Sequence, residues 1–287
     1  MQTCWSRRLV AVLTACLLIS LIVVAADAQA RAAARVGDTF EVVFEQTTEE
    51  TGDFQNGSSF TRQTLIERVV GVSDDGVELE FAQPGEANGR QWQFPVRVFK
   101  PRSGPLRMLN RPELEQRLDA WLAAAKLPKS ACGRWIFTWT AYRIECDPES
   151  ALRIAEQFDL RSADFTEGAP YTTDGALGPA PLKRSVDGSG TVTYTVELQI
   201  DAAAVLEARI RSDLAVAEMM GKPLTADQVR QVHECEAVTG RISLSFELDP
   251  EGGVRRRTRT TEIKTADRDG RSGAQTVVET MTRTRVR

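Results

Sequence analysis

Histidine is almost absent from this chain of 287 residues, and His233 is its only example. Zinc sites use three or four ligands at recognisable spacings, and no second ligand cluster accompanies His233-Glu234-Cys235. A single histidine also excludes mechanisms that need two. A histidine in the last turn of a helix interacts favourably with the helix dipole. We therefore expect a structural role for His233, and we predict neither a metal site nor a cofactor.

Catalytic signatures are absent as well. The sequence contains no G-x-S-x-G, S-x-x-K, Walker loop or H-E-x-x-H motif. Paired carboxylates carry out acid–base chemistry in many enzymes, but nothing in the pattern singles out a pair. The sequence therefore names no catalytic residue and favours a non-enzymatic protein. A hydrolase with unrecognised carboxylates is one alternative.

The first thirty residues have the pattern of a signal peptide. Arg7 and Arg8 precede the apolar run Leu9 to Ala26, and Ala28-Gln29-Ala30 matches a small-x-small cleavage site. This predicts a signal peptide over residues 1–30 and a mature, periplasmic protein from Arg31. The run of 18 residues is near the lower limit for crossing a bilayer, so an uncleaved N-terminal membrane anchor is the alternative.

The charge of the mature chain is ordinary. The full chain carries 36 basic and 40 acidic residues, and cleavage would remove Arg7, Arg8 and Asp27. Nucleic-acid-binding proteins are marked by basic stripes and a high isoelectric point, neither of which occurs here. We therefore expect no nucleic-acid partner.

Three cysteines remain after cleavage: Cys132, Cys146 and Cys235. An exported protein is expected to pair two of them. The stretch between Cys132 and Cys146 has the pattern of a strand, which would hold its ends about 46 Å apart at ~3.3 Å per residue. A disulfide allows at most about 7 Å between Cα atoms. The pattern therefore predicts Cys146–Cys235, with three unpaired buried thiols as the alternative.

The stretch from Trp135 to Glu145 predicts a central strand of the sheet. Bulky and β-branched residues occupy both of its faces, and no typical turn residue occurs within it. Trp135, Phe137 and Trp139 share one face. With Trp92 and Phe94 on an earlier predicted strand, they are candidates for an apolar ligand site. The alternative is that these aromatics are packed core.

The whole pattern predicts the α+β class. Alternating runs indicate about nine strands in meander-like order, and apolar spacing with caps indicates four helices. We expect a large, mainly antiparallel, curved sheet with the helices packed on one side. Residues 31–287 would form one domain, or two halves, 31–160 and 191–287, joined by the Gly/Pro-rich loop 161–190.

These features together favour an envelope binding module. The expected partner is a lipid, another apolar ligand or a polypeptide segment, or another envelope protein. The link from curved sheets to lipid carriage is an analogy at the level of fold. An interaction or scaffold module with a fully packed core is the competing hypothesis.

Overall fold

The computed structural model describes residues 34–53, 56–85, 91–102, 104–137, 141–160, 165–222, 224–233, 236–267 and 270–286. The predicted signal peptide 1–30, Trp139 and Cys235 lie outside these ranges, as does the side chain of Phe137. No helix in the described ranges has the length and apolarity needed to span a membrane.

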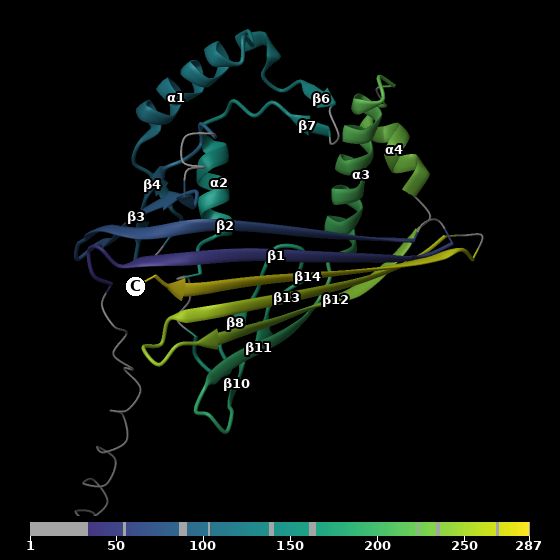
Figure 1. The fold of residues 1–287 in the computed structure, drawn as a ribbon. Helices are drawn as coiled ribbons and strands as arrows, with labels where there is room; N and C mark the ends of the chain where they lie inside the picture. Colours follow the sequence, from purple (N-terminus) through teal and green to yellow (C-terminus); the bar gives the residue numbers. More distant parts are fainter. Residues whose placement is uncertain are drawn as a thin grey trace, which may run out of the picture.

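One large antiparallel sheet dominates the molecule (Figure 1). Its order is β10-β11-β12-β13-β14-β1-β2-β3-β4-β5, so β10 and β5 are its two open edges. The first five strands are β1 Thr39–Gly52, β2 Gly57–Val72, β3 Gly76–Ala82, β4 Val96–Pro101 and β5 Arg107–Met108. The other five are β10 Lys183–Val186, β11 Val192–Gln199, β12 Ala237–Leu248, β13 Val254–Ala266 and β14 Ser272–Arg285. The predicted large antiparallel sheet is therefore confirmed.

The first and the last strand of the described chain pair in the middle of this sheet. β14 pairs with β1 over a long register that runs from Phe40↔Arg285 to Gly52↔Gly273. Strands from before residue 160 and after residue 190 consequently belong to one continuous sheet.

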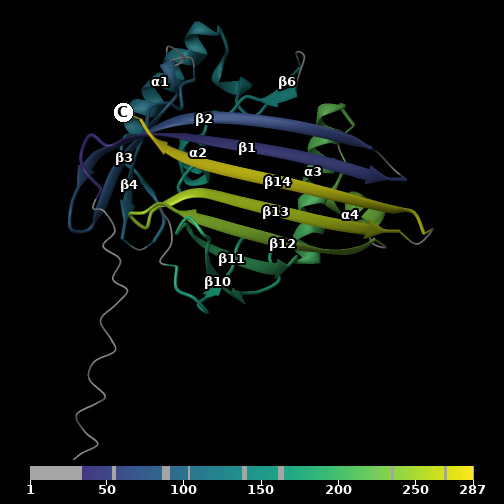
Figure 2. The ribbon, with the colours of Figure 1, turned by 60° about the horizontal axis from the view of Figure 1, so that its bottom comes forward.

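Four helices lie on one side of the sheet, as predicted (Figures 1 and 2). They are α1 Arg111–Ala124, α2 Glu149–Gln157, α3 Ala202–Met219 and α4 Ala226–His233, with a short 3₁₀ turn, η2, at Lys129–Ala131. Asp201 caps α3 by accepting from the N–H groups of Ala203 and Ala204. Thr225 and Gln228 form the predicted capping box of α4.

The hydrophobic core lies between the sheet and helices α1 and α2. Inward positions of the strands, such as Val42, Leu79 and Val98, are fully buried and pack with Leu114 of α1 and Phe158 after α2. The Asp75-Gly76 turn joins β2 to β3 as expected from its sequence. The strand predicted to carry Trp92 and Phe94 begins only at Val96, so both aromatics precede β4.

The predicted central strand from Trp135 to Glu145 is wrong. Residues Trp135–Phe137 form β6 and Ala141–Arg143 form β7, and these pair with each other as a separate two-stranded sheet. The chain therefore folds back on itself instead of crossing the large sheet.

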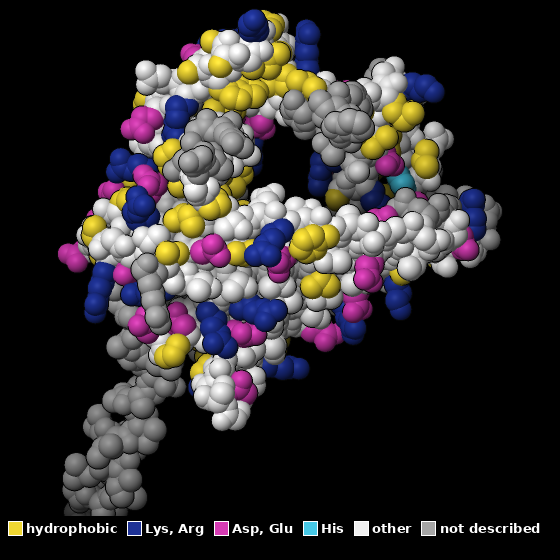
Figure 3. Space-filling model, in the orientation of Figure 1, with side chains coloured by type: hydrophobic (Ala, Val, Ile, Leu, Met, Phe, Trp, Pro, Cys, Tyr) yellow, Lys and Arg dark blue, Asp and Glu magenta, His cyan; other side chains and the backbone are white. Residues whose placement is uncertain are grey.

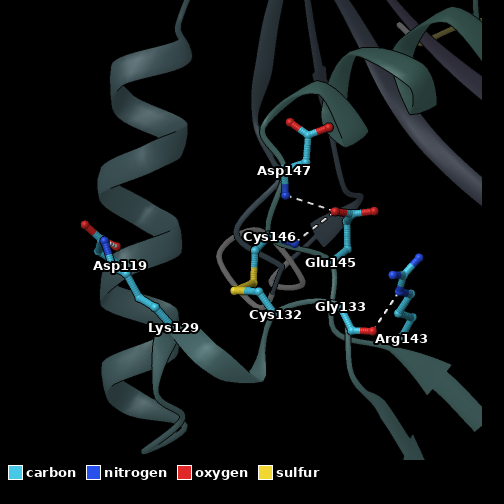
Figure 4. Close-up of a disulfide and its surroundings, with 8 residues drawn as sticks. All are labelled: Asp119, Lys129, Cys132, Gly133, Arg143, Glu145, Cys146 and Asp147. Atoms are coloured by element: carbon cyan, nitrogen blue, oxygen red, sulfur yellow. Dashed lines mark hydrogen bonds and ion pairs between the residues drawn. A yellow bond between two sulfur atoms is a disulfide. The ribbon is translucent and has the colours of Figure 1, made fainter.

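This reversal also overturns the predicted Cys146–Cys235 bond. Cys132 and Cys146 form a disulfide with their Cα atoms 5.6 Å apart (Figure 4). The N–H of Gly133 donates to the carbonyl oxygen of Ile144, and the N–H of Ile144 donates to that of Arg134, which continues the pairing of the hairpin toward this bond. The carboxylate of Glu145 accepts from the N–H groups of Cys146 and Asp147, at 2.9 Å each. The bond becomes possible because a hairpin brings together two ends that a continuous strand would separate.

Part of the Gly/Pro-rich loop covers the sheet. Its described portion contains β8 Pro170–Tyr171, β9 Ala180–Pro181 and the edge strand β10. Phe165 and Tyr171 pack on Phe246 of β12, and Ala176 bridges to Ile200. This segment thus contributes side chains to the interior.

Candidate functional site

The inner face of the sheet, which faces the helices, changes from apolar to polar along the strands. On β1, Val42 and Phe44 are buried, and Phe44 lies opposite the buried Met281 of β14. Residues two apart on a strand share a face. The next inward positions of β1 are therefore Gln46, Thr48 and Glu50. The apolar core gives way to polar side chains halfway along the sheet.

The helices leave this polar half partly uncovered. In the space-filling view, the molecule is hollowed between α2 and α3, below the β6–β7 hairpin and above the sheet (Figure 3). Two groups of elements cover the inner face, α1 and α2 at one end and α3 and α4 at the other (Figure 1). The sheet thus carries two covered regions with an open passage between them.

A cavity of about 500 Å³ lies under α3. Helix α3 forms one wall, and the adjoining ends of β1, β13 and β14 form the other. The helix contributes Val205, Ala208, Arg209, Ser212 and Asp213, whose helical spacing places them on one face. The strands and their turns contribute Glu50, Thr51, Gly52, Ile263, Thr265, Ala266, Asp267, Gly273, Ala274 and Gln275.

A charged cluster forms one side of this cavity. His233, at the end of α4, contacts Asp213 of α3 through Nε2 at 2.8 Å and Glu236 through Nδ1 at 2.9 Å. Glu236 also accepts from Arg209 Nη1 at 2.7 Å. These contacts tie α4 and the start of β12 to α3.

Two opposing effects set the pKa of His233. Burial, the largest influence, lowers the pKa, but the hydrogen bonds to Asp213 and Glu236 act against it. Together with the negative charge of both carboxylates they outweigh burial and raise the pKa above its ordinary value. The cluster thus favours the imidazolium form, consistent with the structural role expected from the sequence.

The aromatic residues predicted to bind a ligand are divided between two places. Trp92 and Phe94 lie in the hydrophobic core, 4% and 3% exposed. Trp135 is half-buried on β6, and its indole N–H is buried without a hydrogen-bond partner among the described residues. Of Phe137 only the backbone is described, in β6. A ligand-binding role for these residues stays a prediction.

The residues that line the cavity were not identified from the sequence. One signal was present, because Val205, Ala208 and Ser212 give α3 small side chains along one face. Small side chains on a helix that covers a sheet leave unfilled space between the two. The strands that complete the cavity lie far away in the chain, and only the β14–β1 pairing brings them together.

Comparisons with known proteins add little to this geometry. No protein-family model matches the sequence, and no curated protein is significantly similar to it. Among solved structures, an outer membrane channel from Pseudomonas putida F1 is similar at 6% identity, with a TM-score of 0.24. The match covers 90% of this chain and 99% of the channel. A similarity at this TM-score supports no conclusion about fold or function.

Proposed function

We propose that the protein is an exported, periplasmic binding module that holds an apolar ligand, a lipid or a polypeptide segment between α3 and the sheet. The observation that carries this proposal is the cavity of about 500 Å³ under α3. Sites for small molecules are concave and commonly enclose about 300–1,000 Å³. The cavity is therefore large enough to take part of such a ligand.

The lining of the cavity suits a ligand with both apolar and polar parts. Val205, Ala208 and Ile263 offer apolar surface, while Arg209 and Asp213 offer charge. Apolar walls with a few placed polar groups are typical of sites that bind small molecules. An amphipathic ligand matches this lining better than a purely hydrocarbon one.

The disulfide supports export. Disulfides persist in oxidising compartments such as the periplasm and are rare in the cytosol. The bond between Cys132 and Cys146 is consistent with the signal-peptide pattern of residues 1–30. Periplasmic residence of the mature chain is part of the proposal.

The competing hypothesis is a scaffold with a packed core. The burial of Trp92 and Phe94 favours it, because the aromatics nearest β4 are used for packing. The cavity and the open passage lie at the other end of the sheet, however, away from that packing. A packed core at one end is compatible with a binding site at the other.

Titration with a neutral apolar fluorophore, N-phenyl-1-naphthylamine, tests the proposal. We expect saturable binding to the purified protein, and we expect Ala208→Trp to weaken it at least about tenfold because the indole fills the cavity. Ala203→Trp is the matched control, since Ala203 is exposed on the same helix and lies outside the cavity lining. Absence of saturable binding, or equal binding by both variants, would contradict the proposal.

A further inference from the structure

The inner face of the sheet carries several charged side chains, and most of them are paired. Arg283 pairs with Glu67, Lys100 pairs with Asp159, and Arg259 lies 3.6 Å from Glu279. These pairs follow the rule that buried charges are matched by partners.

Arg257 departs from this rule. It lies on the inner face of β13, because its neighbours in register, Phe246 of β12 and Met281 of β14, are both buried. Its guanidinium makes no hydrogen bond or ion pair with any described residue. Burial, the largest influence, lowers the pKa of Arg257, while the charges of Glu279 and Asp159 act against it without forming an ion pair with the guanidinium. A half-buried guanidinium that makes no hydrogen bond with the described residues has donors available to a ligand.

Two further donors lie beside it. Arg259 is two residues along the same strand and so shares the inner face, about 6.6 Å away at ~3.3 Å per residue. Its Nη2 donates to the carbonyl oxygen of Asp174 at 2.9 Å, while its Nε is buried without a partner among the described residues. Arg259 therefore has donor capacity left over.

Tyr171 supplies the third donor. It packs edge-on against Phe246, and both arginines act on its hydroxyl electrostatically. Burial raises the pKa of Tyr171 and the arginines only partly oppose this, so the hydroxyl keeps its proton at neutral pH. None of the hydrogen bonds among described residues involves this hydroxyl. Two guanidinium groups and one phenol thus gather at one place on the inner face, with Glu279 as the carboxylate beside them.

We propose that Arg257, Arg259 and Tyr171 bind the anionic head group, carboxylate or phosphate, of an amphiphilic ligand. The inference rests on the proposed binding function and specifies the chemistry of the ligand. Guanidinium groups match the planar, paired oxygens of such anions. The ligand supplies the direct hydrogen-bond partner that Arg257 lacks among the described residues.

The same strand leads from this head-group site to the cavity. Ile263, which lines the cavity, lies four residues beyond Arg259, about 13 Å away at ~3.3 Å per residue. Between them, Thr261 and Val277 pair in register and are only half-buried. An extended fatty-acyl chain spans this distance, so its tail reaches the space under α3.

The test compares a charged and an uncharged form of one probe. We expect dansylamino-undecanoic acid to bind the full chain more tightly than its methyl ester. Arg257→Met should lower the affinity for the acid at least about tenfold, because a hydrogen bond to a charged group is lost. The same variant should leave the affinity for the ester unchanged. Competition by dodecanoate and by dodecyl phosphate then tells a carboxylate site from a phosphate site.

The controls separate binding from folding. Arg255→Met removes a positive charge from the β-bulge of β13, where Arg255 is exposed and contacts Glu247, and should leave the affinity for both probes unchanged. Arg257→Met should change the melting temperature little, since Arg257 makes no hydrogen bond or ion pair with the described residues. Arg257→Lys should retain part of the preference for the acid.

Each outcome has a definite meaning. Tight binding of both probes with no effect of Arg257→Met would overturn the head-group site and leave the binding module intact. Failure of the wild-type chain to bind either probe would overturn the proposed function, and the head-group site with it.

Discussion

Arg283 of β14 and Glu67 of β2 form an ion pair that reaches across the strand between them. Arg283 Nη2 lies 3.0 Å from Glu67 Oε1, and the Glu67 side chain is fully buried. Because β1 separates β14 from β2 in the sheet, the pair links three strands. The guanidinium also stacks over the ring of Phe40 on β1. The contact thus connects β14 to β1 and β2.

Removing one partner of this pair should destabilise the fold strongly. Glu67→Leu leaves the Arg283 charge buried and unpaired, and we expect a loss of about 3–5 kcal/mol in the free energy of unfolding, measured in urea. The double variant with Arg283→Met should recover most of the loss. Arg62→Met is the control, because Arg62 and Glu45 form an exposed pair worth at most about 1 kcal/mol. Equal effects of Glu67→Leu and Arg62→Met would contradict this view of the pair.

The disulfide makes a prediction that peptide mapping can check. Digestion without reduction should yield a peptide that joins Cys132 to Cys146, and alkylation of the denatured protein should label Cys235. A closed loop of about 15 residues contributes on the order of 3 kcal/mol in the chain-entropy model. Reduction should therefore lower the free energy of unfolding by roughly that amount. A peptide that joins Cys235 to either other cysteine would refute the pairing.

His233 should make stability depend on pH. Its pKa in the folded protein is raised above the unfolded value of about 6.5 by the hydrogen bonds to Asp213 and Glu236, against the effect of burial. A raised pKa stabilises the fold fully below about pH 6.5, and this stabilisation is lost as the pH rises through the folded value. The melting temperature should consequently fall across that window.

The variant His233→Leu isolates this effect, because the chain contains no other histidine. Asp213 and Glu236 remain in the variant, as does Arg209, so the titration of His233 alone is removed. We expect the melting temperature of the variant to be nearly flat where that of the wild type falls. Parallel pH profiles for the two proteins would show that the cluster does not act as described.

The aromatics ahead of β4 should behave as core. Trp92 is 4% exposed, and truncation of a large buried aromatic leaves a cavity. We expect Trp92→Ala to cost about 3–5 kcal/mol in the free energy of unfolding by chemical denaturation. A cost below about 1 kcal/mol would instead indicate that Trp92 lines a space able to hold a ligand.

Local sequence signals predicted most of the elements. The strict alternation from Val192 to Ile200, the cap at Asp201 and the capping box at Thr225 all correspond to structure. Each of these signals acts within a few residues, so the sequence carries it directly.

The signals failed at one hairpin that lacks typical turn residues and at a cavity built from strands that lie far apart in the chain. Between Arg134 and Glu145, bulky and β-branched residues without Gly, Pro, Asn or Asp favoured one continuous strand. The chain instead reverses, and a covalent bond closes the hairpin at Cys132 and Cys146. The cavity under α3 depends on the pairing of β14 with β1, which joins residues more than 200 positions apart. No local pattern reports such a pairing.

Native mass spectrometry of the purified protein tests the binding function most directly. The account predicts a second species that is heavier than the folded chain by one small molecule, and depletion of this species in Ala208→Trp but not in Ala203→Trp. The mass difference should be that of an anionic amphiphile. A wild-type protein that carries no such species and gains none when dodecanoate or dodecyl phosphate is added would contradict the account.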